Sequence, residues 1–418
     1  MKLFGEEVSV PKTYFRGTHR FIAPAETLRR FSPSLPALGI TRLADITGLD
    51  CIGLPVYVAI RPNARALATS QGKGFDHDSA KASAMMESIE SWHGERAEMP
   101  LVHDSHSALS RRHAAADPLQ LSASAGATPR RDVPYLWARG WDLVSEQPMY
   151  VPYEAVTVNF VFPPGYRPTF AVSSNGLSSG NHALEATVHA LCEVVERDAH
   201  SLWSLGGTDA RARTAVNLAS VDDEACRTVL SLLERAGIGV AAWDMTSDTG
   251  VPAYACQIAD RPENARWRTI GPASGYGCHL SPGVALTRAL TEAVQSRLTF
   301  IAGSRDDCFY RSYEAFGNRD NLERGWRLLA QASDAVSFRA RAALDGPTFE
   351  DDVRTLVERL RAVGVTSAVV VDLSRGELGI PVVKVVVPGL EGHYKSVSYR
   401  PGSRAAAHVG LAAKTRSA

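Results

Sequence analysis

The chain lacks an excess of charge of either sign, because 45 lysine and arginine residues balance 45 aspartate and glutamate residues. Binding to a phosphate backbone or an anionic lipid surface usually requires a basic excess, so we expect no nucleic-acid partner. Long apolar runs are also missing. No stretch approaches the ~18 apolar residues of a membrane span, and Glu6 and Glu7 stand where a signal peptide would need its apolar segment. We therefore expect a cytoplasmic protein with no membrane contact.

Paired cysteines are absent as well. The six cysteines stand singly, without a Cys-x-x-Cys pair, which argues against a zinc site or a redox motif. Most of them are expected to be buried apolar thiols. A kinase-type His-Arg-Asp loop is also missing, which argues against a protein kinase.

The composition that is present, 45% hydrophobic and 22% charged, is typical of a globular protein. A chain of 418 residues forms either several domains or one large α/β unit. Strand-like segments alternate with helical ones, which predicts a mixed α/β fold. Three times a glycine-bearing loop precedes a long helix, and we expect the three units to converge on one site. The predicted pairs are loop 63–78 with helix 79–97, loop 175–180 with helix 182–204, and loop 271–283 with helix 284–301.

The remaining segments are predicted to be structural. An amphipathic helix begins at Ser220, its predicted cap, and ends before Gly237. Paired strands follow it. Residues 105–133 are small and polar, as in a surface excursion, and the tail after Gly402 is predicted to be loose.

Two pairs of glutamates lie on the first two of the long helices. Glu87 and Glu90 are three residues apart, as are Glu193 and Glu196, so each pair shares one helix face. Either pair alone is equally compatible with an ordinary solvated face. Together the four carboxylates would repel one another unless cations neutralised them, and hard oxygen ligands select Mg²⁺ or Ca²⁺. We therefore expect Mg²⁺ that bridges to phosphates.

The segment Ser70–Gly74 fits a phosphate ligand, because its two glycines let the backbone approach oxygens and Lys73 adds a positive charge. It is not a Walker A loop, since Lys73 precedes a glycine rather than serine or threonine.

A di-iron centre is a weaker alternative. Glu90 and His93 form the Glu-x-x-His unit of such centres, but Ala199 stands where a second copy needs histidine after Glu196. The helical histidines, including His93, His189 and His200, are expected to be packing or surface residues.

These motifs, in this order, resemble the YcaO superfamily. The resemblance covers about residues 12–402. It is carried by Lys12–Thr18, Ser70–Gly74, Glu87-x-x-Glu90, Asn175–Gly180 with Glu185, Glu193-x-x-Glu196-Arg197, Glu292-x-x-Gln295-Ser296-Arg297, Ile380–Lys384 and Pro388–Glu391.

The resemblance implies a mixed α/β fold in which acidic helices pack on mixed sheets around an ATP site. By position, it implies that Glu87, Glu90, Glu193 and Glu196 bind Mg²⁺. It further implies that Ser70, Lys73 and Glu292 bind ATP, with added contacts from Lys12 and Arg16, and that Arg197, Gln295 and Arg297 steady phosphates or ligands. We divide the chain into an N-terminal segment (1–60), a catalytic core (61–402) and a tail (403–418).

The resemblance also implies an activity, namely ATP-dependent phosphorylation of a peptide amide oxygen. The chain ends without the Pro-x-Pro-x-Pro tail typical of azoline-forming cyclodehydratases. This favours the TfuA-associated, thioamide-forming type, with a peptide or protein substrate and a TfuA-like partner. Cyclodehydration, an idle binding scaffold, and a ligase or kinase acting on a small carboxylate stay open, as does a homodimer.

Overall fold

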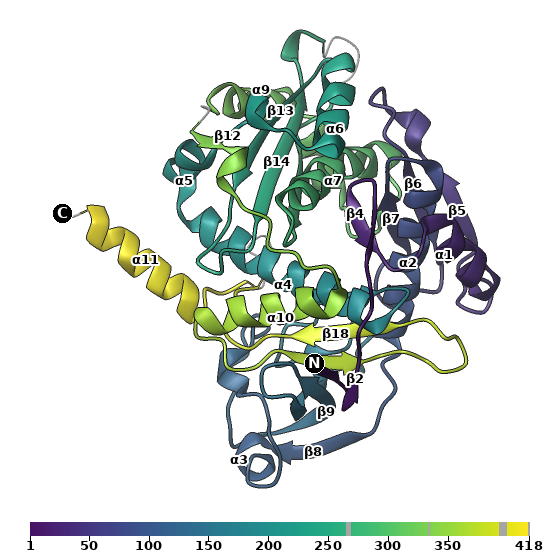
Figure 1. Cartoon of the computed structure of the whole chain (residues 1–418), viewed down its shortest axis with the longest axis vertical. Helices are drawn as coiled ribbons and strands as arrows, with labels where there is room; N and C mark the ends of the chain where they lie inside the picture. Colours follow the sequence, from purple (N-terminus) through teal and green to yellow (C-terminus); the bar gives the residue numbers. More distant parts are fainter. Residues whose placement is uncertain (265–268, 333–334, 393–398, 417–418) are drawn as a thin grey trace.

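Three antiparallel sheets organise the chain (Figure 1). The structure, a computed structural model, describes residues 1–264, 269–332, 335–392 and 399–416. The largest sheet has the order β10-β9-β17-β18-β11, with β8 also paired to β9. Its strands are β8 (Leu101–Ser105), β9 (Pro134–Asp142), β10 (Gln147–Pro152), β11 (Leu177–Ser179), β17 (Val369–Asp372) and β18 (Val382–Val386).

The other two sheets have three strands each. One is formed by β5 (Arg42–Asp45), β6 (Val56–Ile60) and β7 (Thr69–Lys73). The other is formed by β13 (Ile238–Asp244), β14 (Ala253–Asp260) and β15 (Ala273–Cys278). Short two-stranded pairings join β1 (Lys2–Leu3) to β2 (Glu6–Glu7), β3 (Thr13–Phe15) to β4 (Thr18–Arg20), and β12 (Val216–Asn217) to β16 (Val336–Ser337).

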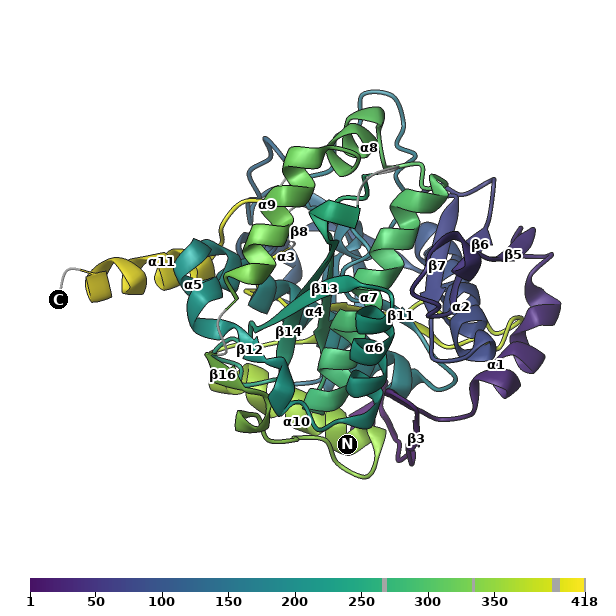
Figure 2. The ribbon, with the colours of Figure 1, turned by 90° about the horizontal axis from the view of Figure 1, so that it is seen from above.

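The helices cover these sheets. They are α1 (Pro24–Phe31), α2 (His77–Glu95), α3 (His106–Leu109), α4 (Ala183–Leu205), α5 (Gly207–Thr214), α6 (Glu224–Arg235), α7 (Pro282–Ala302), α8 (Tyr310–Phe316), α9 (Arg319–Ala330), α10 (Phe349–Ala362) and α11 (Ser403–Arg416). Helix α2 packs on β6 and β7, α7 on β14 and β15, and α4 on β18, β11 and β15. Figure 2 shows α2 beside its sheet, and Figure 1 shows α7 between α6 and α4. Because α4 contacts two of the sheets, it forms the middle of the fold.

Two of the predicted glycine loops contain strands. Residues 69–73 form β7 and residues 273–278 form β15. Their glycines are needed for packing: a Cβ at Gly72 would lie 2.0 Å from the backbone nitrogen of Ala84 on α2, and one at Gly275 would lie 2.3 Å from that of Ala293 on α7. The glycines therefore bring each helix close to its strand.

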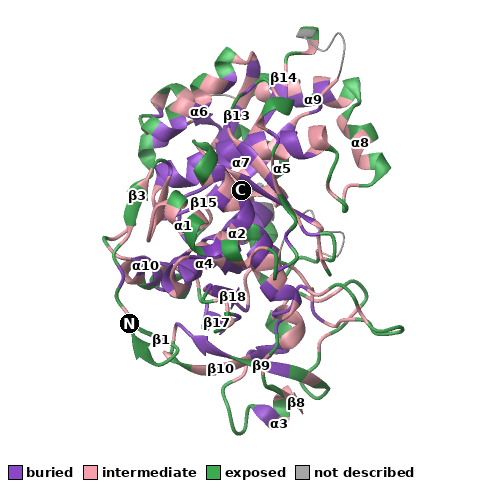
Figure 3. Cartoon of the chain, turned by 90° about the vertical axis from the view of Figure 1, so that its right-hand side faces the viewer, coloured by how far each residue is buried: buried purple, intermediate pink, exposed green. Residues whose placement is uncertain are grey.

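The core joins these layers. Leu191 and Val195 of α4 are fully buried with Val383 and Val385 of β18. Figure 3 shows buried residues concentrated along α4, α7 and β18 and exposed ones on the outer helices. This packing fixes the polar residues of α4 relative to the largest sheet.

Three details correct the sequence predictions. The larger sheets are antiparallel rather than mixed; β17 and β18, for example, lack a crossover helix between them. Asp223, not Ser220, caps α6, since its side chain accepts the N–H of Cys226 at 2.9 Å. The tail after Gly402 is helical, and Arg404 anchors its first turn through two 2.9 Å hydrogen bonds to Asp198 of α4.

The structure also bears on membrane contact. In the described parts of the chain, none of the helices combines the length and the apolar character that crossing a bilayer requires.

Candidate active site

Contacts between the three strand–helix units bring their polar side chains together. The carboxylate of Glu90 on α2 accepts a 2.8 Å hydrogen bond from the backbone N–H of Ser179 on β11, the strand that leads into α4. From β7, Lys73 donates from Nζ to Oε1 of Gln295 on α7 at 2.7 Å. The same Nζ lies 3.8 Å from Glu292. The predicted convergence of the three units is confirmed by these contacts.

The four glutamates of α2 and α4 run from the surface inwards. Glu87 is exposed, Glu90 and Glu193 are half-buried, and Glu196 is buried. Burial, followed by repulsion from Glu292 and Glu193, raises the pKa of Glu196 to about 7 against the attraction of Arg197. The site is therefore open at Glu87 and closed at Glu196.

The other three carboxyls are perturbed in the same direction. Surrounding protein restricts the hydration of Glu87 and raises its pKa to about 7, although its side chain reaches solvent. Desolvation, then repulsion by Glu193 and Glu87, holds the pKa of Glu90 well above its ordinary value. Desolvation also raises the pKa of Glu193. Such like-charged carboxyls favour a cation between them.

Two cationic side chains offset part of this charge. Burial lowers the pKa of Lys73, against the attraction of Glu292, Glu87 and Glu196. Arg197 lies 3.6 Å from Glu193 and 3.3 Å from Glu196. Burial disfavours its charge, but the carboxylates outweigh it and raise the pKa of Arg197. Arg197 therefore stays a fixed positive charge.

Two further cations were not predicted. Lys384 on β18 is buried, and burial lowers its pKa to about 8 although Glu193 and Glu90 attract its charge. Its Nζ donates to the backbone oxygen of Ser173 at 2.5 Å. A lone lysine in an otherwise apolar strand was the available sequence signal. Arg288, one turn before Glu292 on α7, stabilises the charged forms of Glu193 and Glu196.

Arg297 lies away from this cluster, which corrects its predicted role. Its Nε donates to Asp50 at 2.9 Å, and its Nη2 lies 3.2 Å from Asp260. Residues two apart on a helix point to different sides, so Gln295 and Arg297 cannot both face Lys73. Arg297 instead forms a buried ion pair.

The predicted contacts from the N-terminal segment are also occupied by other partners. Lys12 Nζ lies 2.7 Å from the buried carboxylate of Asp352 and 3.3 Å from Asp345. Arg16 donates to Thr228 at 2.8 Å and stacks over Phe75. Both side chains therefore have structural contacts away from the four glutamates.

Two serines occupy strand positions. Ser70 is buried on β7, two residues before Gly72 and hence on the strand face that packs against α2. The residues around Ser178 spell Gly-x-Ser-x-Gly, a pattern of hydrolase nucleophiles. However, Ser178 is buried in β11 opposite Val383. It is therefore not an exposed nucleophile.

The histidines have packing contacts, as predicted. His93 is buried and its Nδ1 lies 2.8 Å from the backbone oxygen of Ile89. His189 contacts Arg288, and the ring of His200 lies 4.2 Å from that of Tyr276. These contacts give His93 no part in a di-iron site.

The donor set fits Mg²⁺ shared with a phosphate group. In the described residues, no three His, Cys, Asp or Glu side chains stand close enough to hold a metal ion by themselves. Mg²⁺ in phosphate-binding sites takes one or two carboxylates and completes its shell with phosphate oxygens and water. The raised pKa values of Glu90 and Glu196 indicate unneutralised carboxylates that such an ion would satisfy.

Comparison with known proteins also points to a site for ATP and Mg²⁺. Residues 71–391 match the family model described as YcaO cyclodehydratase, ATP- and Mg²⁺-binding. The chain belongs to the YcaO family. YcaO enzymes modify peptide backbones using ATP, and ATP and Mg²⁺ are accordingly the cofactors of this chain.

Relatives refine the family assignment. An uncharacterized protein in the tfuA 3′ region of Rhizobium leguminosarum bv. trifolii is 35% identical over 393 residues, covering 92% of each chain. This match supports the TfuA-associated type of YcaO protein. An uncharacterized protein of Methanothermobacter thermautotrophicus is 34% identical over 376 residues, covering 88% of this chain and 94% of that protein.

Solved structures share the fold. YcaO from Methanopyrus kandleri bound with AMPPCP and Mg²⁺ superposes with a TM-score of 0.73 at 24% identity, covering 94% of this chain and 98% of that one. A heterocyclase in complex with substrate and cofactor gives 0.75 at 21% identity. The match covers 93% of this chain and 54% of the heterocyclase, so this chain spans about half of that protein's length. The mixed α/β YcaO fold is thereby established.

Proposed function

We propose that the chain phosphorylates the oxygen of a peptide backbone amide with ATP and exchanges that oxygen for sulfur, together with a TfuA-like partner. The observation that carries the proposal is the proximity of the glutamates of α2 and α4 to one another and to Lys73 of β7, whose charge Glu87 and Glu196 attract. The relative in the tfuA 3′ region supports the thioamide-forming type. The cytoplasmic location and the division at residues 60 and 402 are part of the same proposal.

The residues have separate roles in this proposal. Glu87, Glu90, Glu193 and Glu196 would share the binding of Mg²⁺, with one or two carboxylates to an ion and phosphate oxygens and water as its other ligands. When bound, Mg²⁺ neutralises charge on the phosphates. Lys73, oriented by Gln295, and Arg197 supply the positive charge for the transferred group. The charges of Glu292 and Arg288 act on Lys73 and on Glu196. Catalysis by such a site consists mainly of positioning and charge stabilisation.

The reaction balances in two steps. The amide oxygen attacks the terminal phosphorus atom of ATP, and the bond from that phosphorus to the ADP oxygen breaks, so that ADP leaves with loss of the amide proton. Sulfide then adds to the activated carbon, and the carbon–oxygen bond breaks to release phosphate, which carries away the original amide oxygen. An amide is a poor electrophile, so phosphorylation supplies the leaving group that sulfide needs.

Mass spectrometry of the peptide product tests the proposal. With ATP, Mg²⁺, a sulfide source and a TfuA-like protein, we expect one oxygen to be replaced by sulfur without loss of water. Lys73→Ala should abolish the product. Lys81→Ala on α2 should retain it, because Lys81 lies two and a half turns before Glu90 and hence on the opposite face of the helix.

The alternatives give different outcomes in the same assay. Loss of water at Cys, Ser or Thr without sulfur incorporation would identify a cyclodehydratase. Binding of peptide and ATP without turnover would indicate a scaffold, and turnover with small carboxylic acids but no peptide would indicate a ligase or kinase.

A further inference from the structure

Exposed aromatic side chains are concentrated on two segments of the surface. In the described residues, the exposed large aromatics are Phe4, Tyr14, Phe160, Tyr166, Phe309 and Tyr310, and four of these six lie on residues 160–166 or at the start of α8. Phe309 and Tyr310 are 74% and 76% exposed, and Val161 is 64% exposed. We call Phe160, Val161, Phe309 and Tyr310 the apolar rim.

The loop of residues 62–68 joins the two halves of the rim. Its Arg65 oxygen accepts the backbone N–H of Phe160 at 3.1 Å, and its Ala68 N–H donates to Asp306 at 3.1 Å. Arg65 and Ala68 are three positions apart in the chain, so the two contact points lie within roughly 11 Å of each other. The two segments therefore flank a single short stretch of chain.

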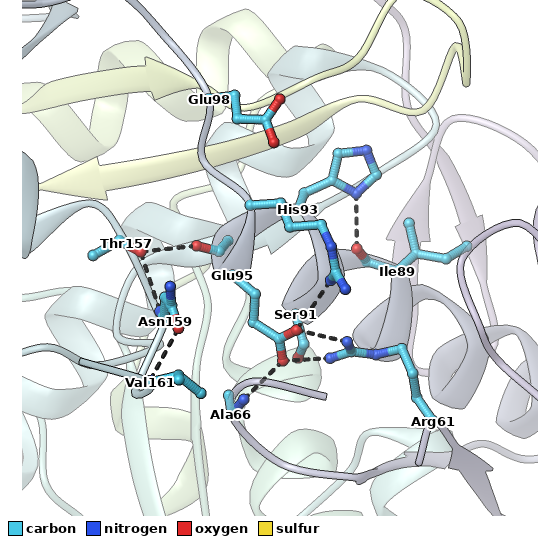
Figure 4. Close-up of polar contacts among 12 residues, drawn as sticks. Arg61, Ala66, Ile89, Ser91, His93, Glu95, Glu98, Thr157, Asn159 and Val161 are labelled. Atoms are coloured by element: carbon cyan, nitrogen blue, oxygen red, sulfur yellow. Dashed lines mark hydrogen bonds and ion pairs between the residues drawn. The ribbon is translucent and has the colours of Figure 1, made fainter. Parts of the chain in front are cut away.

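The end of α2 fixes this loop (Figure 4). Glu95 accepts two hydrogen bonds from Arg61, at 2.6 and 2.5 Å, and one from the N–H of Ala66 at 3.0 Å. Both side chains of the ion pair are buried. Burying an ion pair carries a desolvation cost and is weak evidence for stabilisation, so we read the pair as a device that positions the loop.

The same helix end fixes residues 157–161. The backbone oxygen of Gly94 accepts from the N–H of Val158 at 2.9 Å and from the hydroxyl of Thr157 at 3.3 Å. Asn159 then accepts the N–H of Val161 at 3.0 Å, as Figure 4 shows. Phe160 and Val161 are thus held in place while their side chains face solvent.

The rim borders the candidate active site. Glu87 and Glu90 lie on the turns of α2 that precede Glu95. From the other half, the hydroxyl of Thr69, at the start of the strand that carries Lys73, donates to the backbone oxygen of Ser304 at 3.5 Å. The segment that leads to α8 therefore lies against the strand of the candidate site. Since Glu87 is the exposed end of the glutamate series, the rim lies at the open end of the site.

We propose that the apolar rim binds the part of the peptide substrate next to the amide that is modified, and that this part is uncharged and rich in aliphatic or aromatic side chains. The inference rests on the proposed function. Aromatic side chains give a large contact area for apolar groups, and continuity with the charged site places the occupant beside the reacting amide. Two of the charges on this border, Arg305 and Asp307, form an ion pair with each other at 2.6 Å.

Fluorescence anisotropy with two synthetic peptides tests the inference. The peptides have equal length and charge; one carries Leu and Phe around a central Gly-Gly amide, and the other carries Ser and Asn there. We expect the full chain to bind the apolar peptide about tenfold more tightly, and a Phe309→Ala/Tyr310→Ala variant or Phe160→Ser to lose this preference. The matched control is Leu119→Ala, which removes an apolar side chain that lies outside the rim and is 55% exposed. This variant should keep the preference for the apolar peptide.

The assay measures binding without turnover. Its result is therefore independent of whether the chain forms a thioamide. Equal binding of the two peptides, no binding of either, or an unchanged preference in the rim variants would overturn the inference. Sedimentation in which the rim variants convert a dimer into monomers would also overturn it, because the rim would then be covered by a second copy. Unchanged Mg·ATP binding in the rim variants would show that they keep the folded site.

Discussion

At the scale of single residues, Glu196 shows how the fold prepares its site for a cation. Its side chain is buried, and burial together with neighbouring carboxylates raises its pKa from 4.5 to about 7. The folded protein therefore binds a proton at Glu196 at pH values where the unfolded chain has lost it. Stability falls with pH wherever the folded state binds more protons. The contribution of Glu196 is complete below pH ~4.5 and disappears as the pH rises through ~7.

Glu196→Gln should remove this dependence. We expect the ligand-free wild type to lose stability between pH ~5 and ~7, by about 1.4 kcal/mol for each unit of pKa shift, and the variant to lose less. Protection by Mg·ATP should grow over the same range in the wild type, since Mg²⁺ binds the ionised carboxylate, and should be weakened in the variant. Melting curves across this range measure both effects.

The control is Glu358→Gln, an exposed residue of α10. If Glu358→Gln and Glu196→Gln give the same pH profile and the same Mg·ATP shift, Glu196 is not part of the cation site.

At the scale of elements, the strand–helix contacts depend on glycine. A Cβ at Gly72 would meet the backbone of Ala84 at 2.0 Å and that of Ala80 at 2.3 Å, and neither backbone group can move without displacing α2. Because α2 carries Glu87 and Glu90, the same displacement would separate these glutamates from Lys73. Stability and site geometry are therefore coupled at Gly72.

Gly72→Ala should lower the free energy of unfolding by ~1–3 kcal/mol, which is the typical cost of overpacking a protein core. Gly376→Ala is the matched control, because a Cβ at Gly376 meets nothing within 4 Å. Urea denaturation compares the two. Equal stability of both variants would contradict the close packing of β7 on α2.

Sequence patterns predicted every end of the three long helices to within two residues, since the apolar faces of these helices are local information. The strands β7 and β15 were missed, because glycine and serine have low strand propensity and only packing against α2 and α7 extends them. Arg297 was assigned to the site from motif order alone, whereas helix geometry directs it to Asp50. Lys384 was overlooked because the field of Glu193 and Glu90 that surrounds it comes from distant segments.

At the scale of the whole molecule, segments far apart in sequence complete one another. The N-terminal residues supply β5 and β6 of the sheet that β7 finishes, and Lys12 pairs with Asp352 of α10. At the other end, Glu391 accepts the N–H groups of Gly402 and Ala405 at 2.9 and 2.8 Å, which fixes the start of α11 beside α4. The site is thus built by a single continuous fold, and its chemistry is the property to measure.

Transfer of the amide oxygen to phosphate is the most direct measurement of the central claim. A peptide labelled with ¹⁸O at its backbone amides is incubated with the chain, Mg·ATP, a sulfide source and a TfuA-like protein, and the released phosphate is analysed by mass spectrometry. Phosphorylation of an amide oxygen predicts one ¹⁸O atom in the phosphate for each modified peptide. Unlabelled phosphate alongside a modified peptide would contradict amide phosphorylation.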